Sequence, residues 1–156
     1  MPALNDVSIV IPTHDRLPLL REAIRSASLQ SVDPQIIVVR SNGESAAENL
    51  GLEFPGIMVI ECSGERAASR NAGCDRATGD WVLFLDDDDL LLPGALEVLL
   101  SAARPHNADA ARGTRIDFAD GHATPDAQGD EPAFEHFLAS DDLVIGAEIQ
   151  IGRAHV

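Results

Sequence analysis

The sequence predicts an α/β fold with a mostly parallel sheet flanked by helices. Short β-branched apolar runs alternate with amphipathic or Ala-rich stretches, and polar residues follow directly where several of these runs stop. This alternation is typical of βαβ units, whose crossover helices cover the faces of a parallel sheet. At 156 residues with 45% hydrophobic content, the chain is long enough for one domain with a substantial core.

The first predicted unit is a strand at residues 7–11 followed by a helix. The run VSIVI is apolar, mostly β-branched and closed by Pro12, which is typical of a buried strand. Apolar residues then recur at intervals of three and four, and Pro18 falls where a first helical turn tolerates proline. The recurring residues are Leu17, Leu20, Ala23, Ile24 and Ala27. Their spacing predicts a helix with one apolar face.

Three more strands and a second long helix follow. Strands are expected at residues 36–39 and 57–60, because turn-forming residues bound both apolar runs. Residues 65–77 are Ala-rich and charged, which favours a helix lying on the sheet. The fourth strand is expected at residues 81–85, and an acidic run begins near its end.

The remainder of the chain is less regular. A Leu-rich helix is expected to start at Pro93, and the Gly, Asp and Pro content of residues 117–131 favours a loop. A short helix at 132–139 and a final strand at 143–149 are expected after it. There is no internal repeat.

Composition and charge narrow the function classes. With 26 acidic and 11 basic residues and a net charge of −15, the chain is not expected to bind nucleic acid or an anionic membrane surface, because both attract basic patches. It shows neither a bilayer-spanning apolar run nor a secretory signal, which favours a cytoplasmic protein or the cytosolic part of a larger one. Cys62 and Cys74 match no disulfide or zinc spacing, so reduced thiols and no zinc site are expected.

The stretch FLDDDDLLLPG at residues 84–94 places four carboxylates in a row. A solvated loop is one interpretation, with one Asp capping the next helix, but adjacent like charges repel unless a cation is nearby. A calcium loop of the EF-hand kind would have Leu90 at its fifth position and Leu91 in place of its turn glycine. A receiver-type phosphoacceptor site would require a pair of acidic residues after the first strand, but the chain has Thr13-His14-Asp15 there.

A third interpretation is a D-x-D metal site, Asp86-Asp87-Asp88. Mg²⁺ is usually held by one or two carboxylates together with substrate phosphates. A bridging divalent cation would offset the repulsion and allow an acidic protein to bind a diphosphate. The run also follows a strand, and ligands of open α/β sheets bind beyond the carboxyl ends of the strands.

Three segments together resemble a known family. VSIVIPTHDR at residues 7–16, IIVV at 36–39 and AASRNAGCDRATGDWVLFLDDDDLLLPGALE at 67–97 resemble the donor-binding half of family 2 glycosyltransferases, which have the Rossmann-like GT-A fold. The resemblance implies transfer of a sugar from a nucleotide-diphosphate sugar to an acceptor, with inversion at the anomeric carbon. It also implies Mn²⁺ or Mg²⁺ on the diphosphate. The acceptor (saccharide, lipid or protein) and any membrane contact stay open.

The same resemblance implies overlapping nucleotide and metal sites. Asp88 is expected to ligate the metal together with Asp86, and either Asp86 or Asp87 is expected to hold the ribose hydroxyls. Asp89 is expected to orient its neighbours or to start the next turn. Arg70 is expected at the nucleotide or the diphosphate, since a guanidinium suits phosphate geometry. The glycine of the RNAG motif, Gly73, is expected to let helix and sheet approach closely. The expected nucleotide-binding residues are Pro12, Thr13, His14, Arg40, Arg70, Asp86 and Asp87.

The chain departs from the family pattern after its second strand. The family usually has an acidic pair there, whose first carboxylate reads the base of the sugar donor, but this chain has Arg40. Arginine only donates hydrogen bonds and cannot accept one from a base N–H. The family's usual recognition of uridine, through a carboxylate that accepts from the base, is therefore not expected of Arg40. Either Ser41 or Asn42 is expected to replace the missing acceptor, or Arg40 instead pairs with a neighbouring Asp or with a carboxylate of the sugar donor. His14 stands where the family often has Tyr.

The resemblance implies a general base in an acceptor-binding half, which is expected to lie beyond the residues of this sequence. Asp141 and Asp142 precede the expected last strand rather than follow it, so no catalytic residue is assigned. The last six residues, IGRAHV, are what a sequencing-adapter-like sequence would encode if it were read in frame. We therefore expect residues 1–150 to be a truncated donor-binding domain, residues 151–156 to be a non-native tail, and the chain to transfer little or no sugar.

Two other functions remain open at this point. A nucleotidyltransferase that makes sugar nucleotides is also α/β and uses a metal, but it normally has a Gly-rich loop after its first strand, and PTHDRLP contains no glycine. A non-catalytic domain that binds a metal or a nucleotide would show a metal affinity that does not depend on nucleotide.

Overall fold

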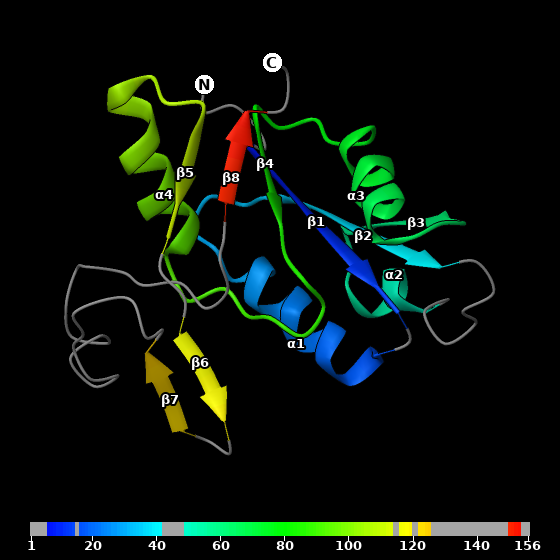
Figure 1. Ribbon diagram of the computed structural model, residues 1–156. Coiled ribbons are helices and arrows are strands. Elements are labelled where there is room, and N and C mark those ends of the chain that lie inside the picture. Colours follow the sequence, from blue (N-terminus) through cyan, green and yellow to red (C-terminus); the bar gives the residue numbers. More distant parts are fainter. Residues whose placement is uncertain are drawn as a thin grey trace.

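A computed structural model describes residues 6–14, 16–41, 49–113, 116–119, 122–125 and 150–153. Its main feature is a six-stranded sheet with strand order β3-β2-β1-β4-β8-β5 (Figure 1). β1 to β4 pair in parallel, whereas β8 is antiparallel to β4 and β5. The strands are β1 (Val7–Thr13), β2 (Gln35–Ser41), β3 (Met58–Cys62), β4 (Trp81–Phe84), β5 (Ala110–Arg112) and β8 (Gln150–Arg153). The predicted mostly parallel α/β sheet is confirmed.

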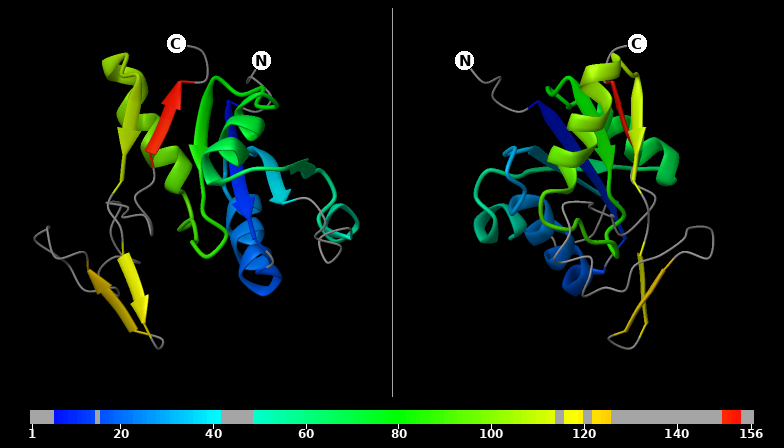
Figure 2. Two further views of the ribbon diagram at one scale, coloured as in Figure 1. Left: turned by 45° about the vertical axis from the view of Figure 1, so that its right-hand side comes forward. Right: turned by 90° about the vertical axis from the view of Figure 1, so that its left-hand side faces the viewer.

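Helices cover both faces of this sheet (Figure 1 and Figure 2). The apolar residues of β1 alternate between two cores, as successive side chains of a strand must. Val7, Ile9 and Ile11 pack with apolar residues of α1 and α4, while Val10 belongs to a second core against α3. The helices are α1 (Leu17–Ser28), α2 (Leu50–Glu53), α3 (Arg66–Cys74), α4 (Ala95–Ala103) and the 3₁₀ helix η2 (Arg104–His106).

The structure differs from the sequence expectations mainly after β4. α4 begins at Ala95 rather than Pro93, because Gly94 has φ 78°, outside the right-handed helical region. Part of the expected loop at 117–131 is a two-stranded antiparallel sheet of β6 (Ile116–Ala119) and β7 (His122–Pro125). The helix expected at 132–139 and the strand expected at 143–149 lie outside the described residues.

Gly73 brings α3 onto the sheet, and its replacement is expected to destabilise the protein. A Cβ at this position would lie 2.2 Å from Cγ1 of Val10, far inside van der Waals contact. We expect Gly73→Ala to lower the free energy of unfolding by about 1–3 kcal/mol, the usual cost of overpacking a core. Urea denaturation followed by circular dichroism measures this change.

Two further variants control this prediction. Gly51→Ala adds a methyl group where nothing lies within 4 Å, in helix α2, and is expected to leave stability unchanged or to raise it slightly. In a Val10→Ala background the clashing Cγ atoms are gone, so the added cost of Gly73→Ala should shrink. An equal cost in both backgrounds would show that close approach to Val10 is not the reason for the glycine.

Candidate nucleotide and metal site

The acidic run follows β4 where this strand ends beside β1. Val10 of β1 is opposite Phe84 of β4, and the Leu85 N–H donates to the Val10 carbonyl over 3.0 Å. The strand order reverses between these two strands, since β2 lies on the other side of β1. A crevice at such a switch point, beyond the carboxyl ends of the strands, is the usual ligand site of an open α/β sheet.

Asp87 is the buried member of the acidic run and is only 1% exposed. Its Oδ2 accepts hydrogen bonds from Thr13 Oγ1 over 2.8 Å and from the His14 backbone N–H over 3.2 Å. Its Oδ1 pairs with the guanidinium of Arg16. These contacts tie the loop after β4 to the end of β1, and they satisfy a carboxylate that would otherwise be costly to bury.

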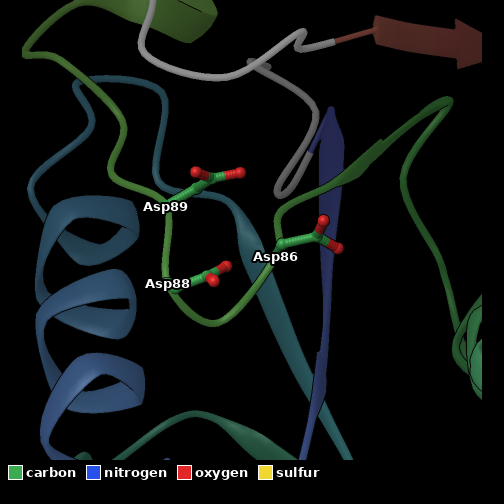
Figure 3. A group of neighbouring side chains, drawn as sticks. All are labelled: Asp86, Asp88 and Asp89. Carbon is green, nitrogen blue, oxygen red and sulfur yellow. The ribbon is translucent and has the colours of Figure 1, made fainter. Parts of the chain in front are cut away.

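The other three carboxylates gather in one place (Figure 3). Asp86, Asp88 and Asp89 each offer a ligand atom, and these atoms all lie within 4.8 Å of one another. A turn brings them together, because the Asp89 N–H donates to the Asp86 carbonyl over 3.1 Å. A cluster of hard oxygen ligands suits Mg²⁺ or Mn²⁺, so the residues present fit the expected metal.

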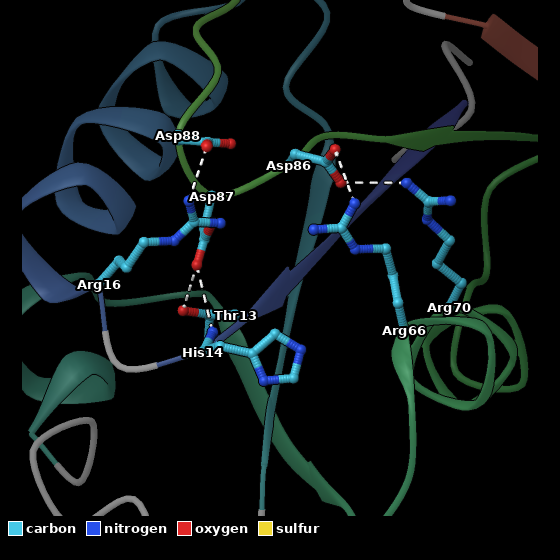
Figure 4. A network of polar contacts seen from close by, with 8 residues as sticks. All are labelled: Thr13, His14, Arg16, Arg66, Arg70, Asp86, Asp87 and Asp88. Atoms are coloured by element: carbon cyan, nitrogen blue, oxygen red, sulfur yellow. Dashed lines mark hydrogen bonds and ion pairs between the residues drawn. The ribbon is translucent and has the colours of Figure 1, made fainter.

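Two arginines of α3 approach this cluster from one side (Figure 4). Nη2 of Arg70 lies 3.0 Å from Oδ1 of Asp86, and Nη1 of Arg66 lies 3.8 Å from Oδ2 of the same residue. The Arg70 guanidinium also lies over the ring of Phe84, 5.5 Å from its centroid. Its Nε is buried without a hydrogen-bond partner in the described part of the chain. Two guanidinium groups of α3 therefore contact the Asp86 carboxylate.

Arg16 approaches from the other side of the run. Its Nη1 lies 2.7 Å from Oδ2 of Asp88, while its Nη2 pairs with Asp87. Burial alone would lower the pKa of the Arg16 guanidinium, but the two carboxylates outweigh that effect and raise it above the ordinary value. Arg16 therefore stays charged at any physiological pH.

The expected nucleotide-binding residues of β1 have different surroundings. Pro12 is buried in the strand, Thr13 is buried and bonded to Asp87, and His14 is exposed just beyond the strand. With Arg70 and the acidic run, these residues share one edge of the sheet. The structure thus brings together most of the set that the sequence predicted.

Arg40 has a partner that the sequence analysis did not foresee. It lies opposite Thr13 of β1 and opposite Glu61 of β3, and its guanidinium pairs with the Glu61 carboxylate. A neighbouring Asp or a carboxylate of the sugar donor was expected, and the ion pair in the structure is with Glu61 of the adjacent strand. Ser41 ends β2, and Asn42 lies outside the described residues, as do Asp141 and Asp142.

Three charged residues of this region escaped the sequence analysis. Arg66 precedes Arg70 by one helical turn, and this i,i+4 spacing places both on one helix face, so the pattern could have indicated it. Arg16 directly follows the THD segment and is a weaker signal. Glu61 could not be found from the sequence, because its pairing with Arg40 depends on strand register.

Two features lie outside this site. Cys62 and Cys74 are free thiols, and burial, with a smaller effect from Asp75, raises the pKa of Cys74 and so disfavours its thiolate. Within the described ranges, no helix has the length and apolar character needed to cross a membrane.

Comparisons with known proteins agree with this fold. The chain is 37% identical over 111 residues to GalNAc(5)-diNAcBac-PP-undecaprenol beta-1,3-glucosyltransferase of Campylobacter jejuni, covering 66% of this chain and 35% of that protein. It is 40% identical over 95 residues to the uncharacterized glycosyltransferase YwdF of Bacillus subtilis, covering 58% of this chain and 35% of that protein. The chain thus spans about a third of the length of these curated relatives.

Solved structures and a family model extend the comparison. The crystal structure of S. aureus TarS 1-349 aligns with a TM-score of 0.70 at 17% identity, covering 96% of this chain and 47% of that one. This likeness confirms the GT-A fold. The model of Glycosyl transferase family 2 matches residues 8–151. With this match over most of its length, the chain belongs to glycosyl transferase family 2.

Proposed function

We propose that this chain is the donor-binding part of a metal-dependent, inverting glycosyltransferase that takes a nucleotide-diphosphate sugar. Family membership supports sugar transfer. The observation that carries the proposal is the cluster of Asp86, Asp88 and Asp89 at the switch point of the sheet, with Arg66 and Arg70 beside it. Carboxylates for a metal and guanidinium groups for phosphates are what a diphosphate site needs.

The side chains of this cluster have separate roles in the proposal. Asp88 and Asp86 would hold Mn²⁺ or Mg²⁺, and the metal would supply charge neutralisation on the diphosphate. Arg70 and Arg66 contact Asp86 from α3, where a guanidinium can exchange one carboxylate oxygen for a phosphate oxygen. They would then stabilise the negative charge that develops on the departing nucleoside diphosphate.

The nucleoside is proposed to occupy the edge formed by β1 and β2. Pro12, Thr13, His14 and Arg40 would line this part of the site, with Glu61 orienting the Arg40 guanidinium. Asp87 already accepts from Thr13, His14 and Arg16. We therefore propose that Asp87 contributes by holding the loop, which leaves Asp86 as the carboxylate for ribose hydroxyls.

Acceptor activation is proposed to need residues other than those described here. The general base is expected in an acceptor-binding part, so this chain by itself should bind the sugar donor and transfer little. The boundary at residue 150 and the non-native origin of residues 151–156 stay predictions, as do a cytoplasmic location and the identity of the acceptor. The Campylobacter relative is named as acting on an undecaprenol-linked acceptor, so a polyprenyl-linked saccharide is a suitable first acceptor for an assay.

Calorimetric titration with nucleotides tests the proposed donor site. UDP, GDP, CDP and dTDP are each titrated with and without Mn²⁺, beginning with UDP because a TarS structure of this fold is in complex with UDP-GlcNAc. We expect one nucleotide to bind, and to bind more tightly when Mn²⁺ is present. Mn²⁺ binding that no nucleotide affects would favour a non-catalytic metal-binding domain, and a folded chain that binds neither would contradict the proposal.

A further inference from the structure

Arg16 connects two adjacent carboxylates of the acidic run. It lies between the end of β1 and the start of α1, and its two terminal nitrogens contact different residues (Figure 4). Nη2 pairs with the buried Asp87, and Nη1 donates to Oδ2 of Asp88 over 2.7 Å. A planar guanidinium can hold two acceptors in a set relative orientation, whereas an ammonium group is a point charge without this fork.

The contacts of Asp87 fix Arg16 in turn. The Asp87 side chain is 2% exposed, and Thr13 and the His14 N–H hold its other oxygen. A chain of hydrogen bonds therefore runs from the end of β1 through Asp87 and Arg16 to Asp88. The Asp88 side chain is 44% exposed, so little packing restrains it, and its ion pair within the described residues is the one with Arg16.

We propose that Arg16 is a positioning residue for the metal ligand Asp88. This inference rests on the metal-dependent function proposed above. By holding Oδ2 of Asp88, Arg16 leaves Oδ1 available to a cation and keeps the carboxylate near those of Asp86 and Asp89. Hydrogen bonds of this kind from outer groups to ligating carboxylates typically change metal affinity by about 10–100-fold.

Simple electrostatics gives the opposite expectation. Arg16 is a cation next to a proposed cation site, so its removal should tighten metal binding if only net charge mattered. If Arg16 positions the ligand, its removal should weaken metal binding, because Asp88 gains rotamers that do not face the cluster. The sign of the change in Mn²⁺ affinity therefore separates the two explanations.

The experiment measures Mn²⁺ affinity without nucleotide, by calorimetry or by electron paramagnetic resonance of free Mn²⁺. Arg16→Gln removes the charge and the fork, and Arg16→Lys keeps the charge but cannot bridge Asp87 and Asp88 in the same way. We expect both variants to bind Mn²⁺ more weakly than the wild type, on the order of tenfold. Arg21→Gln, which removes an arginine of α1 paired with Glu53, is the matched charge control and should bind as the wild type does.

Asp88→Ala separates this inference from the proposed function. If Asp88→Ala loses Mn²⁺ binding while the Arg16 variants bind as well as the wild type or better, Arg16 does not position the ligand and only this inference fails. If the wild type binds Mn²⁺ neither alone nor in the presence of the preferred nucleotide, or if Asp88→Ala binds it normally, the metal site itself is wrong and both fail. Thermal unfolding checks that each variant is folded; if Arg16→Gln is not, the Arg16→Lys result decides.

Discussion

Asp88→Ala is expected to abolish the metal-dependent part of nucleotide binding. Asp88 belongs to the carboxylate cluster and, together with Asp86, is a proposed ligand of the metal. Because Mg²⁺ and Mn²⁺ sites of this kind have only one or two protein carboxylates, loss of one should weaken Mn²⁺ binding by more than roughly a hundredfold, beyond the usual effect of outer groups. Calorimetric titration of the preferred nucleotide with and without Mn²⁺ measures the loss.

The controls for this variant separate metal binding from folding and from net charge. Asp88 is exposed, so its replacement should leave the unfolding transition close to that of the wild type. Asp80→Ala removes an exposed carboxylate that is not part of the cluster and should keep the Mn²⁺ effect. Treatment of the wild type with EDTA should reproduce the Asp88→Ala result. Full retention of the Mn²⁺ effect in Asp88→Ala would rule out this residue as a ligand.

Asp87→Ala is expected to cause the largest loss of stability in the acidic run. The substitution removes the acceptor of Thr13 Oγ1, the His14 N–H and Arg16 at a position that is 1% exposed. Buried donors left without acceptors cost about 1–3 kcal/mol each, and Arg16 keeps Asp88 and access to solvent. We therefore expect a decrease of roughly 2–3 kcal/mol in the free energy of unfolding, measured by urea denaturation.

Isosteric and double variants identify the cause of that loss. Asp87→Asn keeps the shape and one oxygen acceptor, so it should be less destabilising than Asp87→Ala. Thr13→Val removes one partner, and in that background Asp87→Ala should cost less, because the two residues share a hydrogen bond of 2.8 Å. If Asp87→Ala were as stable as Asp80→Ala, the buried network would contribute nothing to the fold.

Much of the fold could be predicted because its signals are local. The apolar runs of β1, β2 and β4 lie between turn residues, and the apolar spacing of α1 needs no distant partner to be recognised. The four-residue α2 and the three-residue β5 were missed. Elements this short carry little periodicity, and their formation depends on the sheet that they contact.

The sequence by itself determined that an acidic run follows the fourth strand of a parallel sheet and that a D-x-D pattern lies within it. Only the tertiary structure decided what each carboxylate does. In the turn after β4, Asp87 is buried and bonded to Thr13, while Asp86, Asp88 and Asp89 gather in a cluster. Their positive partners, Arg16, Arg66 and Arg70, come from segments distant in sequence. Strand register and helix packing set these contacts, and neither can be predicted from local residue patterns alone.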